Sequence, residues 1–213
     1  MPDVIRCGYC DTETSRFGVY CLSCGGQTSP VPRSVSRKLI NGLRDEDLSD
    51  FCYQYVCSVL QERGCYQRNG PSDRLVIGQL PVGLQAGYCL VVLDSEVLNG
   101  GFLQWLTNSS GKLTQETLAA ARAIGARGVI GLLRRVLQLN DAFEAQFPSY
   151  RDRWNWPAPH DPTADAAFEN EVVPHLEEFD EEWYRHPELM TRWNRAFIRY
   201  VRKSPESCVY RRR

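Results

Sequence analysis

The feature that most constrains the fold is a cysteine cluster near the start of the chain, in the sequence CGYCDTETSRFGVYCLSCGG. Two CxxC pairs lie within eighteen residues: Cys7, Cys10, Cys21 and Cys24. In an oxidising compartment such a cluster forms disulfides, whereas in a reducing one its thiolates bind a metal ion. The chain has nine cysteines, an odd number without the spacing of a disulfide framework, and we find neither a signal peptide nor a membrane-spanning run. We therefore expect a cytoplasmic protein whose clustered cysteines are thiolates.

The spacing of these cysteines predicts a structural zinc site. Glycines beside each pair allow the tight knuckle in which backbone N–H groups point at sulfur, and Phe17, Val19 and Tyr20 have the strand character of a short hairpin between the pairs. A module of about 30 residues buries too little apolar surface to fold alone, and a structural zinc ion contributes on the order of 10 kcal/mol. Four cysteine ligands leave no open coordination position, so we expect Zn²⁺ in a structural role. The same ligands suit a rubredoxin-type iron site, and free surface thiols are the alternative to a metal.

Composition divides the chain into four predicted regions. A zinc-ribbon module covers residues 1–30, and a linker rich in proline and serine covers residues 31–44. An all-helical domain follows over residues 45–205, and residues 206–213 form a basic tail. The predicted fold class is therefore mainly α, with a helical domain preceded by a small N-terminal zinc ribbon.

Helical periodicity supports this fold class. Apolar residues recur at helical spacing over residues 48–60, where Cys52 lies on the apolar stripe, and Gly64 ends the run. Cys57, Cys65 and Cys89 are also expected to pack in the core. Residues 65–80 are expected to be a loop, in which RLVIGQL pairs as a strand or simply packs. Further helices are predicted over residues 81–98, from an N-cap at Thr114 to Gly125, over residues 127–140, in the acidic segment that follows, and over residues 187–203.

The segment SEVLNGGFLQWLTNSSG combines a chain break with polar groups. Asn99 and Gly100 suit the C-terminus of a helix, where left-handed φ is needed, and Gly101 allows two helices to pass closely. Phe102 and Trp105 are expected to face the core. Polar side chains beside the break would satisfy the backbone groups that helix ends leave free: Glu96, Gln104 and Asn108. We interpret the motif as a corner between two helices; a ligand pocket is the alternative.

This segment resembles the family of the neisserial DNA mimic protein. The shared pattern is a glutamate, Asn-Gly-Gly-Phe, a glutamine, an aromatic residue, an asparagine and an alanine-rich helix that closes on Ile-Gly-Ala, and EFDEEWY resembles a later segment of that family. The residues that match are Glu96, Asn99, Gly100, Gly101, Phe102, Gln104, Trp105, Asn108 and residues 124–126. The resemblance covers roughly residues 80–200. It implies an all-helical fold and, from the best-known relative, a protein that presents carboxylates in a DNA-like pattern to a DNA-binding partner.

Charge is distributed in two opposite blocks, although the net charge is only −1. Residues 161–188 carry ten Asp or Glu against one Arg, and residues 189–213 carry eight Lys or Arg against one Glu. In the acidic block, helical spacing of the apolar residues leaves four glutamates on an outer arc, whereas Asp180 is expected to be structural, by capping a helix that begins at Glu181 or by projecting between the apolar residues. The four glutamates are Glu177, Glu178, Glu181 and Glu182.

We predict a non-enzymatic protein that binds another protein. The three histidines (His160, His175 and His186) have no neighbouring nucleophile, and no phosphate-binding loop or dinucleotide fingerprint is present. The acidic arc suits a basic DNA-binding partner, and DNA mimicry over a longer distance would require a homodimer. The alternatives are an immunity-type protein that neutralises a toxin, and a nucleic-acid-binding protein that uses the zinc ribbon, the C-terminal arginines and the last helix. In that helix Arg192, Arg195, Arg199 and Arg202 share a face, and three of them, Arg192, Arg195 and Arg199, are also expected to neutralise the acidic arc.

Overall fold

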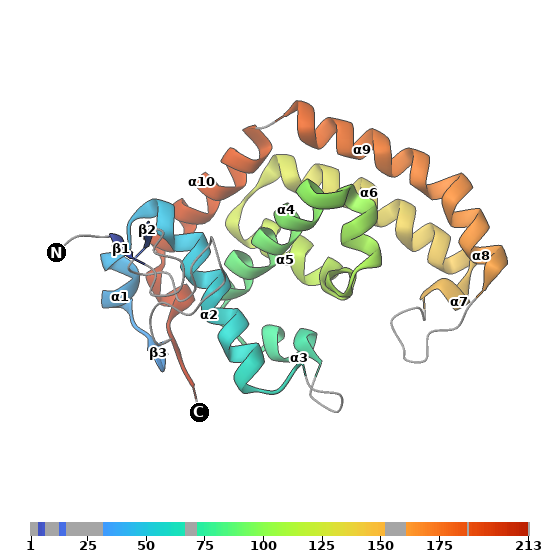
Figure 1. The fold of residues 1–213 in the computed structure, drawn as a ribbon. Coiled ribbons are helices and arrows are strands. Elements are labelled where there is room, and N and C mark those ends of the chain that lie inside the picture. Colours follow the sequence, from blue (N-terminus) through green and yellow to red (C-terminus); the bar gives the residue numbers. More distant parts are fainter. Residues whose placement is uncertain are drawn as a thin grey trace. The chain divides into compact units, whose positions relative to one another are not determined.

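The structure is a computed structural model that describes residues 4–6, 13–15, 32–66, 72–151, 161–186 and 188–212. These residues are mainly helical, as predicted (Figure 1). The chain divides into two compact units. Unit 1 comprises residues 1–91 and 194–213, and unit 2 comprises residues 92–193. The four predicted zinc ligands and the predicted strand at residues 17–20 lie outside the described residues, so the zinc ribbon and the four-region division remain predictions.

Unit 1 combines short helices with two small antiparallel sheets. Strand β1 pairs with β2, with Val4 opposite Ser15, and β3 pairs with β4, with Val35 opposite Tyr210. The elements of unit 1 are β1 (Val4–Arg6), β2 (Glu13–Ser15), β3 (Ser34–Val35), α1 (Arg37–Gly42), η1 (Asp45–Asp47), α2 (Leu48–Glu62), α3 (Asp73–Gly78), the first part of α4 (Val82–Thr107), the last part of α10 (Glu188–Lys203), η5 (Pro205–Cys208) and β4 (Tyr210–Arg211). The region predicted as a basic tail thus forms η5 and β4.

The core of unit 1 contains the apolar stripe of α2. Helical spacing places the stripe on one face of α2, and its apolar residues between Leu48 and Leu60 are almost completely excluded from solvent. The predicted loop at residues 65–80 is wrong in its second half, because α3 forms there. Val76 and Ile77 are both buried whereas Leu75 is 64% exposed. Adjacent buried residues fit a helical turn, since a half-buried strand would alternate between inside and outside.

Unit 2 is entirely helical in its described residues. Helices α5 and α6 form a hairpin whose turn is Gly125, in the left-handed conformation at φ 73°, as the sequence predicts for the end of α5. The predicted N-cap at Thr114 is wrong, because Thr114 is already helical and Leu113 occupies the cap position. The elements of unit 2 are the last part of α4, η2 (Ser109–Leu113), α5 (Thr114–Ile124), α6 (Arg127–Gln146), α7 (Pro148–Arg151), α8 (Pro162–Ala167), the π-helical turn η4 (Phe168–Val172), α9 (Val173–Arg185) and the first part of α10.

Aromatic side chains fill the core of unit 2. Phe102 and Trp105 of α4 are fully buried, as predicted, and their rings meet edge to face with centroids 6.1 Å apart. The ring of Trp183 on α9 meets Phe102 in the same way at 5.8 Å. Helix α9 also runs alongside α6 (Figure 1). The core therefore fixes α9 against both α4 and α6. None of the helices in the described part of the chain combines the length and apolar character needed to cross a lipid bilayer.

Candidate functional site

The Asn-Gly-Gly segment interrupts helix α4, as the sequence predicts. Gly101 has φ 73° and ψ −175°, whereas Gly100 has φ −162° and ψ 29°. The predicted assignment of left-handed φ to Gly100 is therefore wrong, because Gly101 adopts it and Gly100 has a φ that any residue can adopt. The interruption breaks the i to i−4 hydrogen-bond ladder, so carbonyls before it and N–H groups after it need other partners.

Helix α9 supplies a partner on each side of this break. The Phe102 N–H donates to Oδ1 of Asp180 at 2.7 Å, and the Tyr184 hydroxyl donates to the Val97 carbonyl at 2.5 Å. Asp180 and Tyr184 are four residues apart, so they lie on the same face of α9. We call these two hydrogen bonds the α9 clamp. Through this clamp, α9 alone supplies a hydrogen-bond partner to one backbone group on each side of the break in α4.

Asp180 has the structural role predicted for it, on a helix other than the one expected. Helix α9 continues through Glu181, so Asp180 caps no helix there and instead caps the second half of α4. Burial raises the pKa of Asp180, and the hydrogen bond from the Phe102 N–H partly opposes this shift. Gly101 permits the approach, since a Cβ at that position would lie 2.7 Å from Cγ of Asp180. Positive φ and close contact therefore both require glycine at position 101.

A polar network links the two halves of α4 across the break. Oε2 of Glu96 accepts hydrogen bonds from the side-chain amides of Gln104, at 2.7 Å, and Asn108, at 2.8 Å. Oε1 of Gln104 in turn accepts from the Asn99 amide at 2.9 Å. These side chains satisfy one another rather than pointing into a cavity. The geometry thus favours the corner over the ligand pocket.

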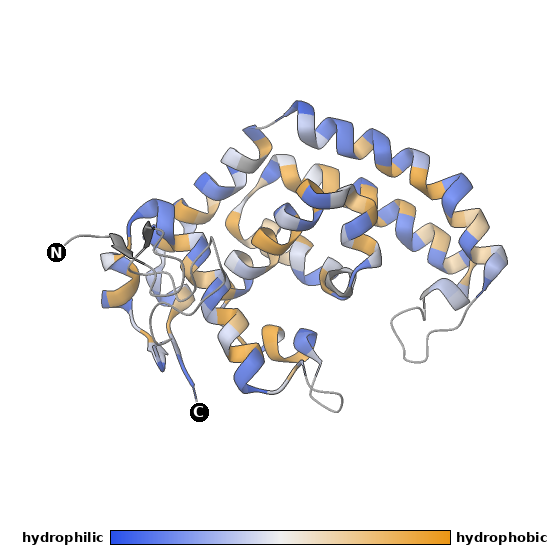
Figure 2. Cartoon of the chain, in the orientation of Figure 1, coloured by the Kyte–Doolittle hydropathy of each residue, from blue (hydrophilic) through white to orange (hydrophobic). Residues whose placement is uncertain are grey.

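The four predicted glutamates lie on the side of α9 opposite its buried face. Leu176 and Trp183 are buried, whereas Glu177, Glu178 and Glu181 are exposed and Glu182 is partly exposed. Figure 2 shows the result as a helix that is mostly hydrophilic, with hydrophobic positions recurring along it. The apolar periodicity of the sequence therefore places these carboxylates on the surface.

Two of these glutamates have an arginine partner. Glu182 pairs with Arg135 of α6, and Glu181 pairs with Arg185 one turn further along α9. The Arg135 guanidinium also lies over the ring of Phe179, 5.0 Å from its centroid. Glu177 has no ion-pair partner among the described residues. The sequence does not identify Arg135 as a partner, because it lies 47 residues from Glu182 along the chain.

The acidic surface is longer than the predicted arc. Elements α8, η4 and α9 follow one another without a gap from Pro162 to Arg185, and they carry Glu169 and Glu171 as further exposed carboxylates. At about 1.5 Å per residue, these 24 residues extend roughly 36 Å. We call this surface the acidic face. The charge count of residues 161–188 is the sequence signal that could have identified the additional glutamates.

Comparison with known proteins identifies the family. The model of the DMP19-like protein family matches residues 78–204, which is more than half of the chain. The chain belongs to the DMP19-like protein family. No curated protein and no solved structure matches it. The family segment contains the α4 corner, the α9 clamp and the acidic face, whereas the CxxC pairs lie outside it.

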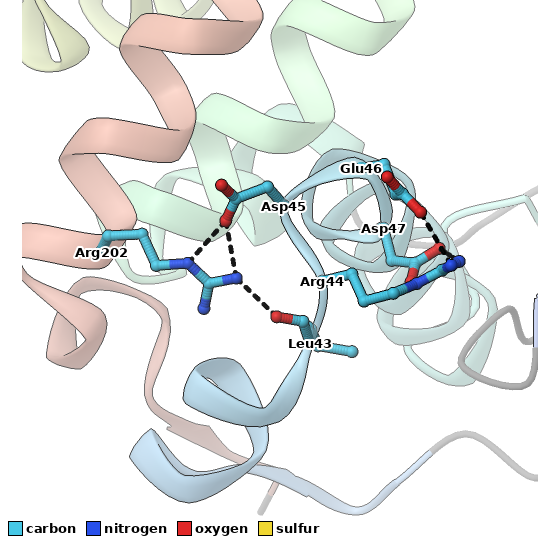
Figure 3. Close-up of polar contacts among 6 residues, drawn as sticks. All are labelled: Leu43, Arg44, Asp45, Glu46, Asp47 and Arg202. Atoms are coloured by element: carbon cyan, nitrogen blue, oxygen red, sulfur yellow. Dashed lines mark hydrogen bonds and ion pairs between the residues drawn. The ribbon is translucent and has the colours of Figure 1, made fainter. Parts of the chain in front are cut away.

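Two arginines of the alternative nucleic-acid surface have structural roles in this DMP19-like protein. Nε of Arg202 donates to Asp45 at 2.8 Å, and one terminal nitrogen donates to the Leu43 carbonyl at 2.5 Å (Figure 3). The other terminal nitrogen donates to the Ile40 carbonyl at 2.8 Å. Arg202 thereby satisfies carbonyls at the end of α1, beside η1, where Arg44 pairs with Glu46 and Asp47 (Figure 3). These contacts reduce the number of cations that the last helix could offer to phosphates.

The second of these arginines is Arg212, from the predicted basic tail. Its guanidinium lies 4.7 Å from the centroid of the Tyr55 ring and donates to Glu62 at 2.7 Å. The side chain is only 14% exposed. Arg192, Arg195 and Arg199 are exposed. These three arginines of the last helix therefore remain accessible to a nucleic acid, if the chain binds one directly.

The described residues contain no cluster of three or more His, Cys, Asp and Glu side chains that could bind a metal ion. His186 lies 3.0 Å from Glu188, and His175 lies 3.8 Å from Glu178, whereas His160 lies outside the described residues.

The five cysteines outside the CxxC pairs form no disulfide bond among the described residues. Cys52, Cys89 and Cys208 are buried, whereas Cys57 and Cys65 are only partly buried. The predicted core packing is therefore correct for Cys52 and Cys89. Hydrogen bonding to Cys208, together with burial, raises the pKa of the Cys52 thiol.

Proposed function

We propose that this DMP19-like protein binds a basic, DNA-binding partner protein through its acidic face and has no enzymatic activity. The observation that carries the proposal is the density of charge on α9. Residues 177–182 place four glutamates on the outer face, which at about 1.5 Å per residue gives roughly one carboxylate per 2.3 Å. Duplex DNA carries about one charge per 1.7 Å. A surface that binds DNA would therefore meet a similar line of negative charge on this helix.

The position of the carboxylates supports the same proposal. They run from Glu169 to Glu182, roughly 20 Å of helix axis at about 1.5 Å per residue, which is more than half of one helical turn of duplex DNA, about 34 Å. Arg135 and Arg185 neutralise part of the charge near Glu181 and Glu182, so the carboxylates toward Glu177 and Glu171 are the ones most available to a partner. A DNA-like line of charge longer than one turn would require a second copy of the chain, and we therefore include a homodimer in the proposal.

The test is a capture experiment in two steps. Proteins retained on the immobilised wild-type chain are identified by mass spectrometry, and the strongest candidate is then purified and titrated at several salt concentrations. We expect the double variant Glu177→Gln/Glu178→Gln to weaken binding and to reduce its salt dependence, because these carboxylates lack an arginine partner among the described residues. Added duplex DNA should compete with the wild-type chain for the partner.

A matched control removes two carboxylates elsewhere. Glu46→Gln/Glu206→Gln changes the net charge by the same amount at exposed surface ion pairs, which contribute little to stability. We expect this variant to bind as the wild type does. Equal binding by both double variants at every salt concentration would exclude the acidic face from the interaction.

The alternatives give different results in the same experiment. Direct nucleic-acid binding would appear as retention of duplex DNA by the chain itself, with steep loss at high salt. An immunity-type protein would capture a toxin that duplex DNA does not displace. We further propose that the CxxC pairs bind structural Zn²⁺ and that the protein is cytoplasmic, on the basis of the number and spacing of its cysteines.

A further inference from the structure

A surface groove lies between α5 and α6 of unit 2. It has a volume of about 250 Å³, and the buried side chains of Leu118 and Leu137 contribute to its lining. Exposed polar side chains from both helices line the rest of it: Gln115, Arg122, Arg134, Gln138 and Asp141. The groove therefore combines an apolar floor with polar walls, which is the usual character of a ligand site.

Four of these polar side chains are not engaged within the part of the chain that the structure describes. Arg122 and Arg134 form no ion pair there, and Gln115 and Gln138 form no side-chain hydrogen bond. The polar side chains of the α4 corner behave differently, because they satisfy one another. Two cations and two amides thus face one groove with their hydrogen-bonding capacity available.

The groove is electrically asymmetric. In the α5–α6 hairpin, Arg122 lies near the turn at Gly125, whereas Asp141 lies four turns along α6 from it. Burial and the neighbouring Glu144 raise the pKa of Asp141, so the charged form of this carboxyl is disfavoured. A ligand with a single negative group would suit the arginine end, whereas a run of phosphates would bring a negative charge close to Asp141.

We propose that this groove binds a peptide segment that presents one acidic side chain. Its carboxylate lies between the guanidinium groups of Arg122 and Arg134, which donate paired hydrogen bonds of the geometry that carboxylates accept. The amides of Gln115 and Gln138 hydrogen-bond the peptide backbone, and an apolar neighbour of the acidic residue covers the two leucines. This site lies on α5 and α6, and it selects a ligand of opposite charge to the partner of the acidic face.

The probe is the capped peptide GGELGG, titrated into the ¹⁵N-labelled full chain and followed by NMR, with GGQLGG as the neutral comparison. We expect the side-chain signals of both arginines and both glutamines to shift with the acidic peptide and not with the neutral one. Arg122→Gln/Arg134→Gln should weaken binding at least about tenfold, because truncating one side of a hydrogen-bonded charge pair has effects of this size. Arg127 is an exposed cation on α6, the helix of Arg134, but it does not line the groove. Arg127→Gln should therefore leave the affinity for the acidic peptide unchanged.

Three results would overturn the proposal: equal binding of the two peptides, unchanged affinity in the double variant, or full displacement of the peptide by an equal concentration of inorganic phosphate. The last result would assign the groove to a free anion. Far-UV circular dichroism checks folding, which we expect to be retained because both arginines are exposed. Arg134→Lys keeps the charge without the planar fork, so it should weaken binding less than Arg134→Gln does.

Discussion

Gly101 is the residue on which the geometry of α4 depends most directly. Its φ of 73° is unfavourable for any residue with a side chain, and its Cα faces the carboxyl group of Asp180. Gly100 has no such constraint on φ, although a Cβ there would clash with Oε1 and lie 3.0 Å from Cβ of Gln104. The two glycines are adjacent in sequence but differ in what they require.

We therefore expect Gly101→Ala to lower the free energy of unfolding by about 1–3 kcal/mol, the range found for strained backbone positions. Gly100→Ala is the matched comparison and should have a smaller effect, since the Gln104 side chain can move. Urea denaturation of the two variants measures the difference. An effect of Gly100→Ala as large as that of Gly101→Ala would contradict this assignment.

Asp94 is a second residue with a measurable consequence. Its Oδ1 atom is buried without a hydrogen-bond partner among the described residues, and burial raises its pKa from 3.8 to about 6. The folded chain therefore binds more protons than the unfolded chain between these two values. Stability from this group is present below pH 3.8 and is lost as the pH rises to about 6.

Asp94→Asn removes this titration. We expect the variant to be more stable than the wild type at pH 7.5, where the wild-type carboxyl is charged, and to show no such advantage at pH 3.5, where it is protonated. Other carboxyls with raised pKa, such as those of Asp50 and Asp180, remain in both proteins, so the difference between the two isolates Asp94. Urea denaturation across this pH range is the measurement. A stability difference that does not change with pH would exclude the buried charge as its cause.

At the scale of elements, α9 combines two roles on two faces. Its inner face carries the clamp and the buried aromatic residues, and its outer face carries the glutamates. Stability and binding should therefore respond to different substitutions in one helix. Variants of the clamp should change unfolding, and variants of the glutamates should change capture of the partner.

Tyr184→Phe tests this separation. It removes the hydroxyl that donates to the Val97 carbonyl and leaves the ring in place. We expect a loss of about 1 kcal/mol in the free energy of unfolding, a typical value for one hydrogen bond. Partner capture, measured at a temperature where both proteins are folded, should be unchanged. Loss of capture without loss of stability would place Tyr184 in the docking surface instead.

Most helices could be predicted from the sequence, because apolar periodicity and a terminal glycine are local signals. Helix α3 could not, since its short apolar run fits a strand or a helix equally well until its packing is known. The α4 corner could be predicted as a corner, but the choice between two adjacent glycines depends on Asp180, 79 positions away from Gly101 in the chain. The clamp and the ion pair of Arg135 depend on such distant partners, which local patterns do not reveal.

At the scale of the whole molecule, the CxxC pairs and the helical units should respond separately to loss of metal. We expect about one zinc per chain by elemental analysis of protein purified without chelator. Cys10→Ser should lose this zinc and expose the first 30 residues to protease, because such a module lacks a core of its own. Far-UV circular dichroism should retain its helical signal. Protein that contains no metal and yet resists proteolysis at its N-terminal end would contradict the zinc site.

The α9 clamp also determines when the break in α4 can be stabilised during folding. Phe102 and Asp180 are separated by 78 positions, and Val97 and Tyr184 by 87, whereas the α5–α6 hairpin closes through a turn of two residues. Closing the larger loops has the greater entropic penalty, so the hairpin should form first and α9 should dock late. A nascent chain that has emerged only as far as α6 would hold a bent helix with both broken ends still hydrated. Asp180→Ala should consequently accelerate unfolding far more than it slows refolding, as a contact absent from the transition state does.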